Sequence, residues 1–257
     1  RANGAENIGF AVGVGDDMLY RVCECLAAGA TFVCVDVAHG HHIMMKEALR
    51  KIRDAIGDDL HIMAGNVATL KAINDLADWG ANSVRCNIGG GSICSTRVQT
   101  GHGHPGLQTI IDCSYTDRDV AIIADGGIRN SGDIVKALAA GADAVMLGSL
   151  LSGTKETPGE VYTRQDGTKY KTYRGMASKE AQVEWRGRYS SFEGVSSTVP
   201  YRGKVRNVLT DLDRGIRSGL SYSGVRSISE LRHSAEFVRQ TSAGLGESRT
   251  HITTRKW

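Results

Sequence analysis

The chain has 257 residues, of which 41% are hydrophobic and 23% charged, a balance that is typical of a globular protein with a sizeable core. Its formal charge of +3 comes from 31 basic and 28 acidic residues, so the sequence lacks the basic excess of a nucleic-acid-binding protein. Apolar runs long enough to cross a membrane are missing, and the six cysteines follow no disulfide pattern of small secreted domains. These features predict a cytoplasmic protein.

Three segments share one phrase, in which the end of a helix and a glycine are followed by a short apolar run. The three phrases begin at Leu26, Leu76 and Leu138. Glycine suits the end of a helix, and such apolar runs are typical of parallel strands that are buried on both faces. Similar runs add three more predicted strands, at residues 8–14, 61–66 and 120–125.

Helical patterns separate these strands, at residues 44–56, 69–79 and 131–140, and Ser131 is the expected N-cap of the last helix. Regular alternation of strands and helices indicates a parallel sheet, either open or closed into a barrel. Six strands are two fewer than a closed eight-stranded barrel needs. We therefore expect the first two βα units of a barrel to be absent from this sequence.

The second half of the chain breaks this period. Residues 155–200 are polar and glycine-rich, which predicts a hairpin and a mobile flap, and helical patterns return at 204–218 and 227–241 before a basic tail. The helix at 204–218 is expected to be a solvated outer helix. We predict a single barrel domain over residues 1–257, with barrel strands 3–8 at about 8–150, the hairpin and flap at about 155–200, and C-terminal helices and a tail at 201–257.

The most informative segment is Asn87-Ile-Gly-Gly-Gly-Ser-Ile-Cys94, which follows a predicted strand. It should lie at the C-terminal mouth of the sheet, where barrels place their active sites. Consecutive glycines let a ligand approach the backbone, and their exposed amides can bind phosphate and favour a thiolate at Cys94. The alternative interpretation is a plain glycine-rich turn with a buried cysteine.

Two more strand ends carry glycine turns. Asp125 is followed by Gly126 and Gly127, and the next strand ends at Gly148 and Ser149. An aspartate in this position can accept ribose hydroxyl groups while the backbone binds phosphate, although Asp125 as a helix N-cap is the alternative. Glycine turns after the last two strands form the usual phosphate site of this barrel class. Together the three segments predict a phosphorylated ligand beside a cysteine.

Six motifs follow one another over nearly the whole chain: Asp36-Val-Ala-His-Gly40, Ala64-Gly-Asn-Val67, Gly91-Ser-Ile-Cys94, Ala124-Asp-Gly-Gly-Ile128, Val145-Met-Leu-Gly-Ser149 and Tyr173-Arg-Gly-Met176. In order and spacing they resemble the IMP dehydrogenase and GMP reductase family. The resemblance implies an α/β enzyme with a TIM (β/α)8 barrel and a flap inserted after the last strand, usually a homotetramer. In this family a cysteine attacks C2 of a purine nucleotide and a nicotinamide cofactor exchanges hydride.

The resemblance also implies roles for individual residues. Cys94 would be the nucleophile, with Thr96 close to the reacting centre. The phosphate, ribose and base of the nucleotide would be bound by Ser92, Asp125, Gly126, Gly127, Gly148, Ser149, Tyr173, Gly175, Met176, Ala177 and Glu193. The cofactor would lie against Asp36, Ala38, Asn66, Asn87 and Gly89. Asn87 is a departure, because the family normally has a glycine there that faces the cofactor.

The resemblance leaves two activities open. The dehydrogenase oxidises IMP to XMP with NAD and hydrolyses the covalent intermediate, whereas the reductase converts GMP to IMP with NADPH and releases ammonia. Arg188-Tyr189 resembles the pair that activates water in the dehydrogenase, and the alternative is a pair in an exposed loop. The segment from Tyr189 to Glu193 is short, as in a reductase. We favour the dehydrogenase and keep the reductase as the alternative.

Residues 237–248 resemble the dehydrogenase tail, which shares a potassium site with the cysteine loop. The resemblance implies that carbonyl groups of Gly89, Gly91 and Cys94 bind K+ together with those around Glu247 and Ser248 of a neighbouring subunit. Two other interpretations stay open. One is an incomplete barrel that is inactive or needs a partner chain. The other is a metal site among histidines whose spacing no cysteine or carboxylate completes, namely His39, His41, His42, His102 and His104.

Overall fold

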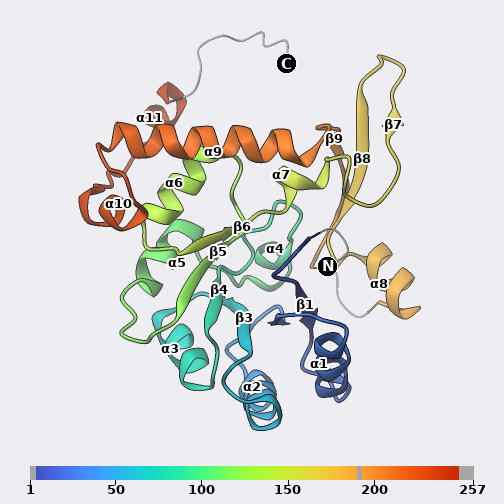
Figure 1. Cartoon of the computed structure of the whole chain (residues 1–257). Helices are drawn as coiled ribbons and strands as arrows, with labels where there is room; N and C mark the ends of the chain where they lie inside the picture. The colour runs from blue at the N-terminus through green and yellow to red at the C-terminus, as the bar shows by residue number, and fades with distance from the viewer. Residues whose placement is uncertain (1–3, 190–192, 249–257) are drawn as a thin grey trace.

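The computed structural model describes residues 4–189 and 193–248 (Figure 1). One sheet contains six parallel strands in chain order: β1 Gly9–Val12, β2 Phe32–Asp36, β3 His61–Val67, β4 Ser83–Cys86, β5 Ala121–Asp125 and β6 Ala144–Met146. All five neighbouring pairs are parallel, and within the described residues β1 and β6 are the edges of the sheet. The predicted parallel α/β sheet is confirmed, and its strand order is that of consecutive strands in a barrel.

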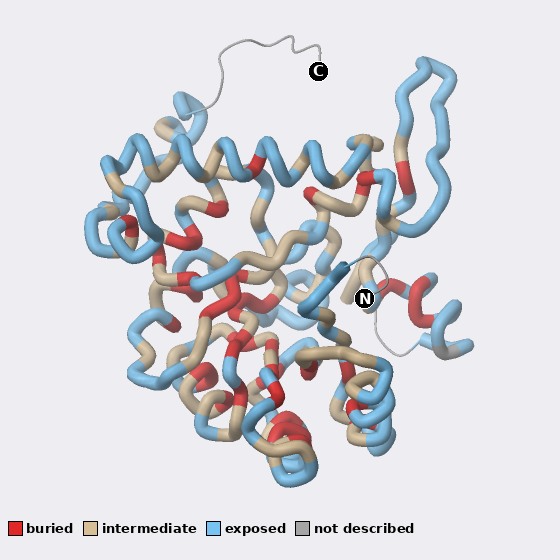
Figure 2. Tube along the Cα trace, in the orientation of Figure 1, coloured by how far each residue is buried: buried red, intermediate tan, exposed pale blue. Residues whose placement is uncertain are grey.

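Helices follow the strands and cover the outer face of the sheet: α1 Met18–Ala27, α2 Ile43–Ile56, α3 Leu70–Asp78, α5 Gly106–Cys113 and α6 Ser131–Ala139. α2 shows why: Met45, Leu49 and Ile52 repeat at helical spacing and are buried, so one face of the helix packs on the sheet. Buried residues accordingly run along the middle strands and the sheet-facing sides of the helices (Figure 2).

The N-cap of α6 is Asn130 and not Ser131, so that prediction was wrong by one residue. The Asn130 side chain accepts a hydrogen bond from the Asp133 N–H at 2.9 Å, while the backbone at Asn130 is extended. Ser131 is the first helical residue. Both residue types suit an N-cap, and the sequence pattern alone does not distinguish two that are adjacent.

Residues beyond β6 form a second, antiparallel sheet. The short helix α7 Ser149–Ser152 precedes β7 Tyr162–Thr163, β8 Lys169–Arg174 and β9 Ser196–Pro200, which pair in this order. A further helix, α8 Lys179–Arg186, lies between β8 and β9, where only a hairpin and a flap were expected. Its ends carry ordinary stop signals, since Ser178 caps its first turn and Gly187 ends it in the left-handed conformation.

Lys171 connects this second sheet to the end of the barrel segment. Its side chain is fully buried, and its ammonium donates to the carbonyl groups of Thr154 at 3.2 Å and Thr157 at 2.5 Å and to the Thr157 hydroxyl at 3.1 Å. These bonds hold β8 against the turn that follows α7. Tyr173, two residues further along β8, is thereby held beside the start of α7.

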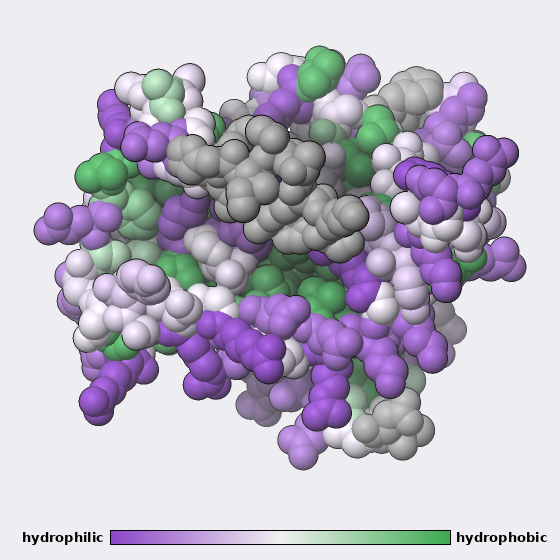
Figure 3. Space-filling view, turned by 90° about the horizontal axis from the view of Figure 1, so that it is seen from above, coloured by the Kyte–Doolittle hydropathy of each residue, from purple (hydrophilic) through white to green (hydrophobic). Residues whose placement is uncertain are grey.

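The C-terminal part contains α9 Val205–Tyr222, α10 Ile228–Ser234 and α11 Ser242–Glu247. The helix expected at 227–241 ends at Ser234, because Ala235 is extended. α9 is solvated on one side only. Its apolar residues pack on α6, as Leu212 and Ile216 do with Ile134 and Leu138, while the face seen from above is mostly hydrophilic (Figure 3). None of the helices in the described residues is long and apolar enough to span a membrane.

Candidate active site

An ion-pair network joins the C-terminal ends of three strands. Arg85 of β4 binds Asp36 at the end of β2 at 2.8 Å and Asp125 at the end of β5 at 2.7 Å. Asn66 of β3 donates a further hydrogen bond of 2.9 Å to the same Asp125 oxygen. Asp125 is not the N-cap of α6, which is Asn130, and it lies in one network with Asp36 and Asn66.

Arg85 was missed in the sequence, although a signal existed: it is the one charged residue in an otherwise uncharged strand. Its side chain is only 13% exposed. Burial alone would lower the pKa of the guanidinium, but the neighbouring Asp125 and Asp36 carboxylates raise that pKa above its ordinary value. A permanent positive charge therefore lies between the two aspartates.

Cys94 is exposed at the mouth of the sheet, which excludes the interpretation as a buried structural cysteine; Cys86 and Cys113 are the buried ones. The Cys94 Sγ lies 3.2 Å from the Thr96 hydroxyl, and this hydroxyl donates to a carboxylate oxygen of Glu193 at 2.9 Å. Because the hydroxyl has one proton, a thiol that donates to it completes a directed chain from sulfur to carboxylate. The chain is a path for moving a proton away from Cys94.

The segment after the flap docks directly on the cysteine loop. Ser95 donates its N–H to the Glu193 carbonyl at 2.9 Å, and Val195 donates to the Ile93 carbonyl at 3.0 Å. Gly194 lies opposite the cysteine in this short antiparallel pairing. A side chain at Gly194 would meet the backbone of the segment before α8 at 2.9 Å, so only glycine allows this approach. The pairing brings Glu193 to Thr96 across 97 residues of sequence.

The predicted phosphate turns lie around the same mouth. Gly126 and Gly127 both have positive φ, of 87° and 79°, and a side chain at Gly126 would lie 3.0 Å from the Gly90 backbone in the cysteine loop. A side chain at Gly148 would lie 3.0 Å from the Tyr173 hydroxyl, so Tyr173 reaches over the turn after β6. The other predicted nucleotide contacts are close neighbours in sequence of Gly90, Gly148 and Tyr173. They are Ser92, Ser149, Gly175, Met176 and Ala177. Met176 is 69% exposed.

Other predicted residues lie further out. Arg188 and Tyr189 follow Gly187 at the end of α8, where the Lys179 ammonium lies 4.9 Å from the centre of the Tyr189 ring. Residues 190–192, the rest of the predicted flap, lie outside the described residues.

Glu247 and Ser248 end α11, which lies beyond α9 and away from the sheet (Figure 1). Of the predicted cofactor residues, Asp36 and Ala38 are exposed at the mouth, whereas the Asn87 side chain is buried and bonds Arg97 and Gly126.

Several of the predicted histidines have protein partners. His41 binds Asp75 at 2.7 Å and stacks on Trp79, His102 binds the Thr100 carbonyl, and His104 binds the Thr109 hydroxyl. Across residues 4–189 and 193–248, no group of three or more histidine, cysteine or acidic side chains is arranged to hold a metal ion.

An exposed cysteine, paired aspartates and glycine turns at the strand ends of a parallel βα sheet are typical of nucleotide-binding α/β-barrel enzymes. The chain belongs to the IMP dehydrogenase / GMP reductase domain family, whose sequence model matches residues 1–251. It is 47% identical over 253 residues to an inosine-5′-monophosphate dehydrogenase of Thermoplasma acidophilum, with 95% of this chain and 51% of the relative covered.

Reductases are similar as well. A GMP reductase of Leishmania major is 40% identical over 257 residues, with 95% of this chain and 52% of that protein covered. A crystal structure of GMP reductase C318A from Trypanosoma brucei in complex with guanosine 5′-monophosphate superposes with a TM-score of 0.93 at 40% identity, covering 99% of this chain and 54% of that chain. The chain thus spans about half the length of the curated relatives it matches.

Proposed function

We propose that this chain forms the catalytic part of a purine nucleotide oxidoreductase that acts at C2 of the base through a covalent bond to Cys94, and that its reaction is the NAD-dependent oxidation of IMP to XMP. The observation that carries the proposal is the chain from Cys94 through Thr96 to Glu193, at a mouth where Asp125 and the glycine turns also lie. Several relatives at 42–47% identity are named inosine-5′-monophosphate dehydrogenase.

The nucleotide would be bound from phosphate to base around this mouth. Positive-φ amides of Gly126 and Gly127, with Gly148, Ser149, Ser92 and the Tyr173 hydroxyl, supply donors for a phosphate. Asp125, held by Arg85 and Asn66, accepts the ribose hydroxyl groups. Residues 175–177 follow Tyr173 and would lie along the base, next to the cysteine loop.

Cys94 then acts as the nucleophile. Its proton leaves through Thr96 to Glu193, and the thiolate forms a bond to C2 of the purine. A nicotinamide cofactor held at Asp36 would supply the acceptor for the hydride of C2. Water then adds at C2 and the thiolate departs, which yields XMP and restores Cys94. Arg188 and Tyr189 would act as the general base for this water, and the proton held on Glu193 returns through Thr96 to Cys94 as the thiolate departs.

Cofactor and cation sites follow from the residues present. The Asp36 carboxylate is 46% exposed at the mouth, which suits the hydroxyl groups of a nicotinamide ribose, and Asn66 and Gly89 lie on neighbouring strand ends. K+ would be bound by carbonyl oxygens of Gly89, Gly91 and Cys94. The C-terminal end of α11, at Glu247 and Ser248 of a neighbouring copy in a homotetramer, would offer further carbonyl groups.

The alternative activity is NADPH-dependent conversion of GMP to IMP. Two observations favour it: the short segment between Tyr189 and Glu193, and the likeness to the two GMP reductases. The chain from Cys94 to Glu193 serves either direction, because ammonia release also needs a proton donor.

The barrel itself would be closed by two further βα units between β1 and β6. The two edge strands support this proposal, since each pairs on one side only within the described residues. The units would come from the same polypeptide or from a partner chain.

A paired assay of NADH formation from IMP and NAD with K+, and of NADPH consumption with GMP, tests the proposal. We expect activity with IMP that is abolished in Cys94→Ala and strongly reduced in Arg188→Ala. Activity with GMP alone, unchanged in Arg188→Ala, would establish the reductase instead. If neither assay shows activity, catalysis by this chain on its own is rejected. The remaining hypothesis is then an incomplete barrel that is inactive or needs a partner chain.

A further inference from the structure

Asn87 has a backbone conformation that its residue type rarely adopts. Its φ is 134°, and it is the only non-glycine residue with a positive φ in the part of the chain that the structure describes. Side chains with a Cβ are strained there, and such strain persists only where surrounding contacts hold it. The contacts of Asn87 therefore indicate what the strain maintains.

The Asn87 side chain links two loops of the active-site mouth. It is 4% exposed, its carbonyl oxygen accepts from Arg97 at 3.3 Å, and its amide donates to the Gly126 carbonyl at 3.5 Å. Gly90 and Gly106 leave room for this amide, because a side chain at either position would lie 2.0 Å or 3.0 Å from it. Arg97 belongs to α4 (Thr96–Thr100), the short helix that follows the cysteine loop, and Gly126 belongs to the turn that carries Asp125.

The backbone of Asn87 joins the same network. Its N–H donates to the Val67 carbonyl at 2.8 Å, and its carbonyl accepts from the Asn66 amide at 3.0 Å. Asn66 also binds Asp125. Asn87 is thus connected to the ribose-binding aspartate through Asn66 on one side and through Gly126 on the other.

Arg97 closes the loop from its far end. Besides Asn87, it donates to the Ile88 carbonyl at 3.2 Å and to the His104 carbonyl at 2.5 Å. The first and last residues of the segment 87–97 are therefore fastened to each other, and Cys94 lies between them. We call the set of bonds among Asn87, Arg97 and Gly126 the loop clamp.

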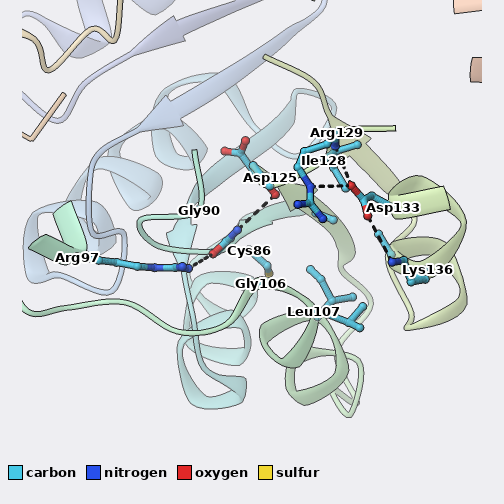
Figure 4. A pocket seen from close by; sticks show the side chains of 16 residues that line it. Cys86, Gly90, Arg97, Gly106, Leu107, Asp125, Ile128, Arg129, Asp133 and Lys136 are labelled. Carbon is cyan, nitrogen blue, oxygen red and sulfur yellow. Dashed lines mark hydrogen bonds and ion pairs between the residues drawn. The ribbon is translucent and has the colours of Figure 1, made fainter. Parts of the chain in front are cut away.

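Space is available for the loop to move without the clamp. A cavity of about 280 Å³ lies beside it, lined by Gly90 of the loop, Arg97 of α4, Leu107 and Ile110 of α5, and Arg129 and Lys136 at α6 (Figure 4). Figure 4 shows Arg97 entering from one side and Asp125, with its turn, from the other. Removing the amide that bridges them would enlarge this cavity and free Gly90 to move into it.

We infer that Asn87 is a positioning residue for Cys94: the loop clamp fixes the cysteine loop at one distance from the turn that binds the ribose and phosphate. The inference rests on the proposed covalent function of Cys94. A residue that only filled space would have no reason to remain in a strained conformation, because glycine relieves the strain at this position.

The test compares Asn87→Gly with wild type in kcat, KM for IMP, melting temperature, and protection of Cys94 by IMP against iodoacetamide. The glycine variant should melt no lower than wild type and bind IMP by calorimetry. It should lose on the order of a hundredfold in kcat, the cost of a misplacement of about 1 Å, with little change in KM. IMP should also cease to protect Cys94. Asn87→Asp keeps the acceptor for Arg97 and loses the donor to Gly126. Its kcat should lie between those of wild type and Asn87→Gly.

Asn82→Gly is the matched control. Asn82 lies at the opposite end of β4, where it bonds Arg53 and the Ile62 N–H, so this variant should lose stability while IMP protects Cys94 as in wild type. Wild-type kcat and unchanged protection in Asn87→Gly would overturn the inference. If wild type binds IMP but turns nothing over, the proposed function fails, and the protection experiment still decides whether the clamp positions Cys94.

Discussion

Arg85 is the residue on which the charge balance of the site depends. Arg85→Gln leaves the Asp125 carboxylate largely buried without its cation, and Asp36 half-exposed without its partner. We expect the free energy of unfolding, measured by urea denaturation, to fall by about 3 kcal/mol. This value is at the lower end of the cost of breaking a buried ion pair, because Asp36 is partly solvated. Arg118→Gln, which breaks a pair of exposed side chains with Asp78, should change stability little. Equal effects of the two variants would contradict a structural role for the buried network.

For single residues, the sequence predicts which end of the sheet a residue lies at better than it predicts where the side chain points. Asp36, Cys94 and Asp125 were predictable at the mouth because each follows a buried strand, and parallel strands end at one edge of a sheet. Arg85 was not, because the side to which a strand residue points depends on pairing register. The direction of the Asn87 side chain, which bonds Arg97 and Gly126, was not predictable either, because it depends on a positive φ that residues other than glycine rarely adopt.

The packing of α9 on α6 depends on small residues. Gly219 lies against Val135, and a side chain there would come within 2.6 Å of a Val135 methyl group. Alanine raises helix propensity by about 1 kcal/mol, yet the clash should outweigh this gain and lower the melting temperature of Gly219→Ala. Ser218→Ala, on the exposed side of the same helix, should raise it slightly. A rise in both variants would show that α9 and α6 are not in close contact.

Asp133 in the first turn of α6 makes the free energy of unfolding depend on pH. Burial raises the pKa of Asp133, but the Arg129 N–H and the charges of Arg129 and Lys136 outweigh it, so the pKa lies below its usual range. The folded state therefore binds this proton less readily than the unfolded state. The stabilisation is complete above the unfolded pKa of about 4 and disappears as the pH falls through the lower folded value.

Asp133→Asn should therefore lower the free energy of unfolding by roughly 0.5–1 kcal/mol at neutral pH and by progressively less below about pH 4. Asn130→Ala, which removes the N-cap without changing the charge, should cost about 1 kcal/mol, similar at both pH values. Urea titrations at a series of pH values give both differences. If the difference in free energy of unfolding between wild type and Asp133→Asn grew as the pH fell, the lowered pKa would be contradicted.

Elements with a buried apolar face were predictable, and those without one were not. α2 and α3 follow the apolar spacing of their sequences. α8 was missed because its residues are mostly polar and exposed, and its caps are the only strong local signals. Residues 235–241 show a helical pattern, but Phe237 and Val238 are exposed, so no packing supports a helix there.

For the whole molecule, the open sheet leads to a prediction about hydrogen exchange. β2 to β5 are paired on both sides, whereas within the described residues β1 and β6 are paired on one side. In the 257-residue chain, the amides of β3 and β4 should exchange slowest, and those of β1 and β6 much faster, because an unpaired edge opens at low cost. Mass spectrometry of peptides covering residues 9–12 and 144–146 measures this directly.

The control is dilution. If β1 and β6 are as protected as β3 at high protein concentration and lose this protection when diluted, a second copy pairs the edges, and the barrel closes between chains. Protection that is equal to that of β3 at every concentration would contradict an open sheet in the chain itself. Fast exchange at both edges that slows when a chain carrying two further βα units is added would instead support closure by those units, because only pairing in register with β1 and β6 protects the two edges together.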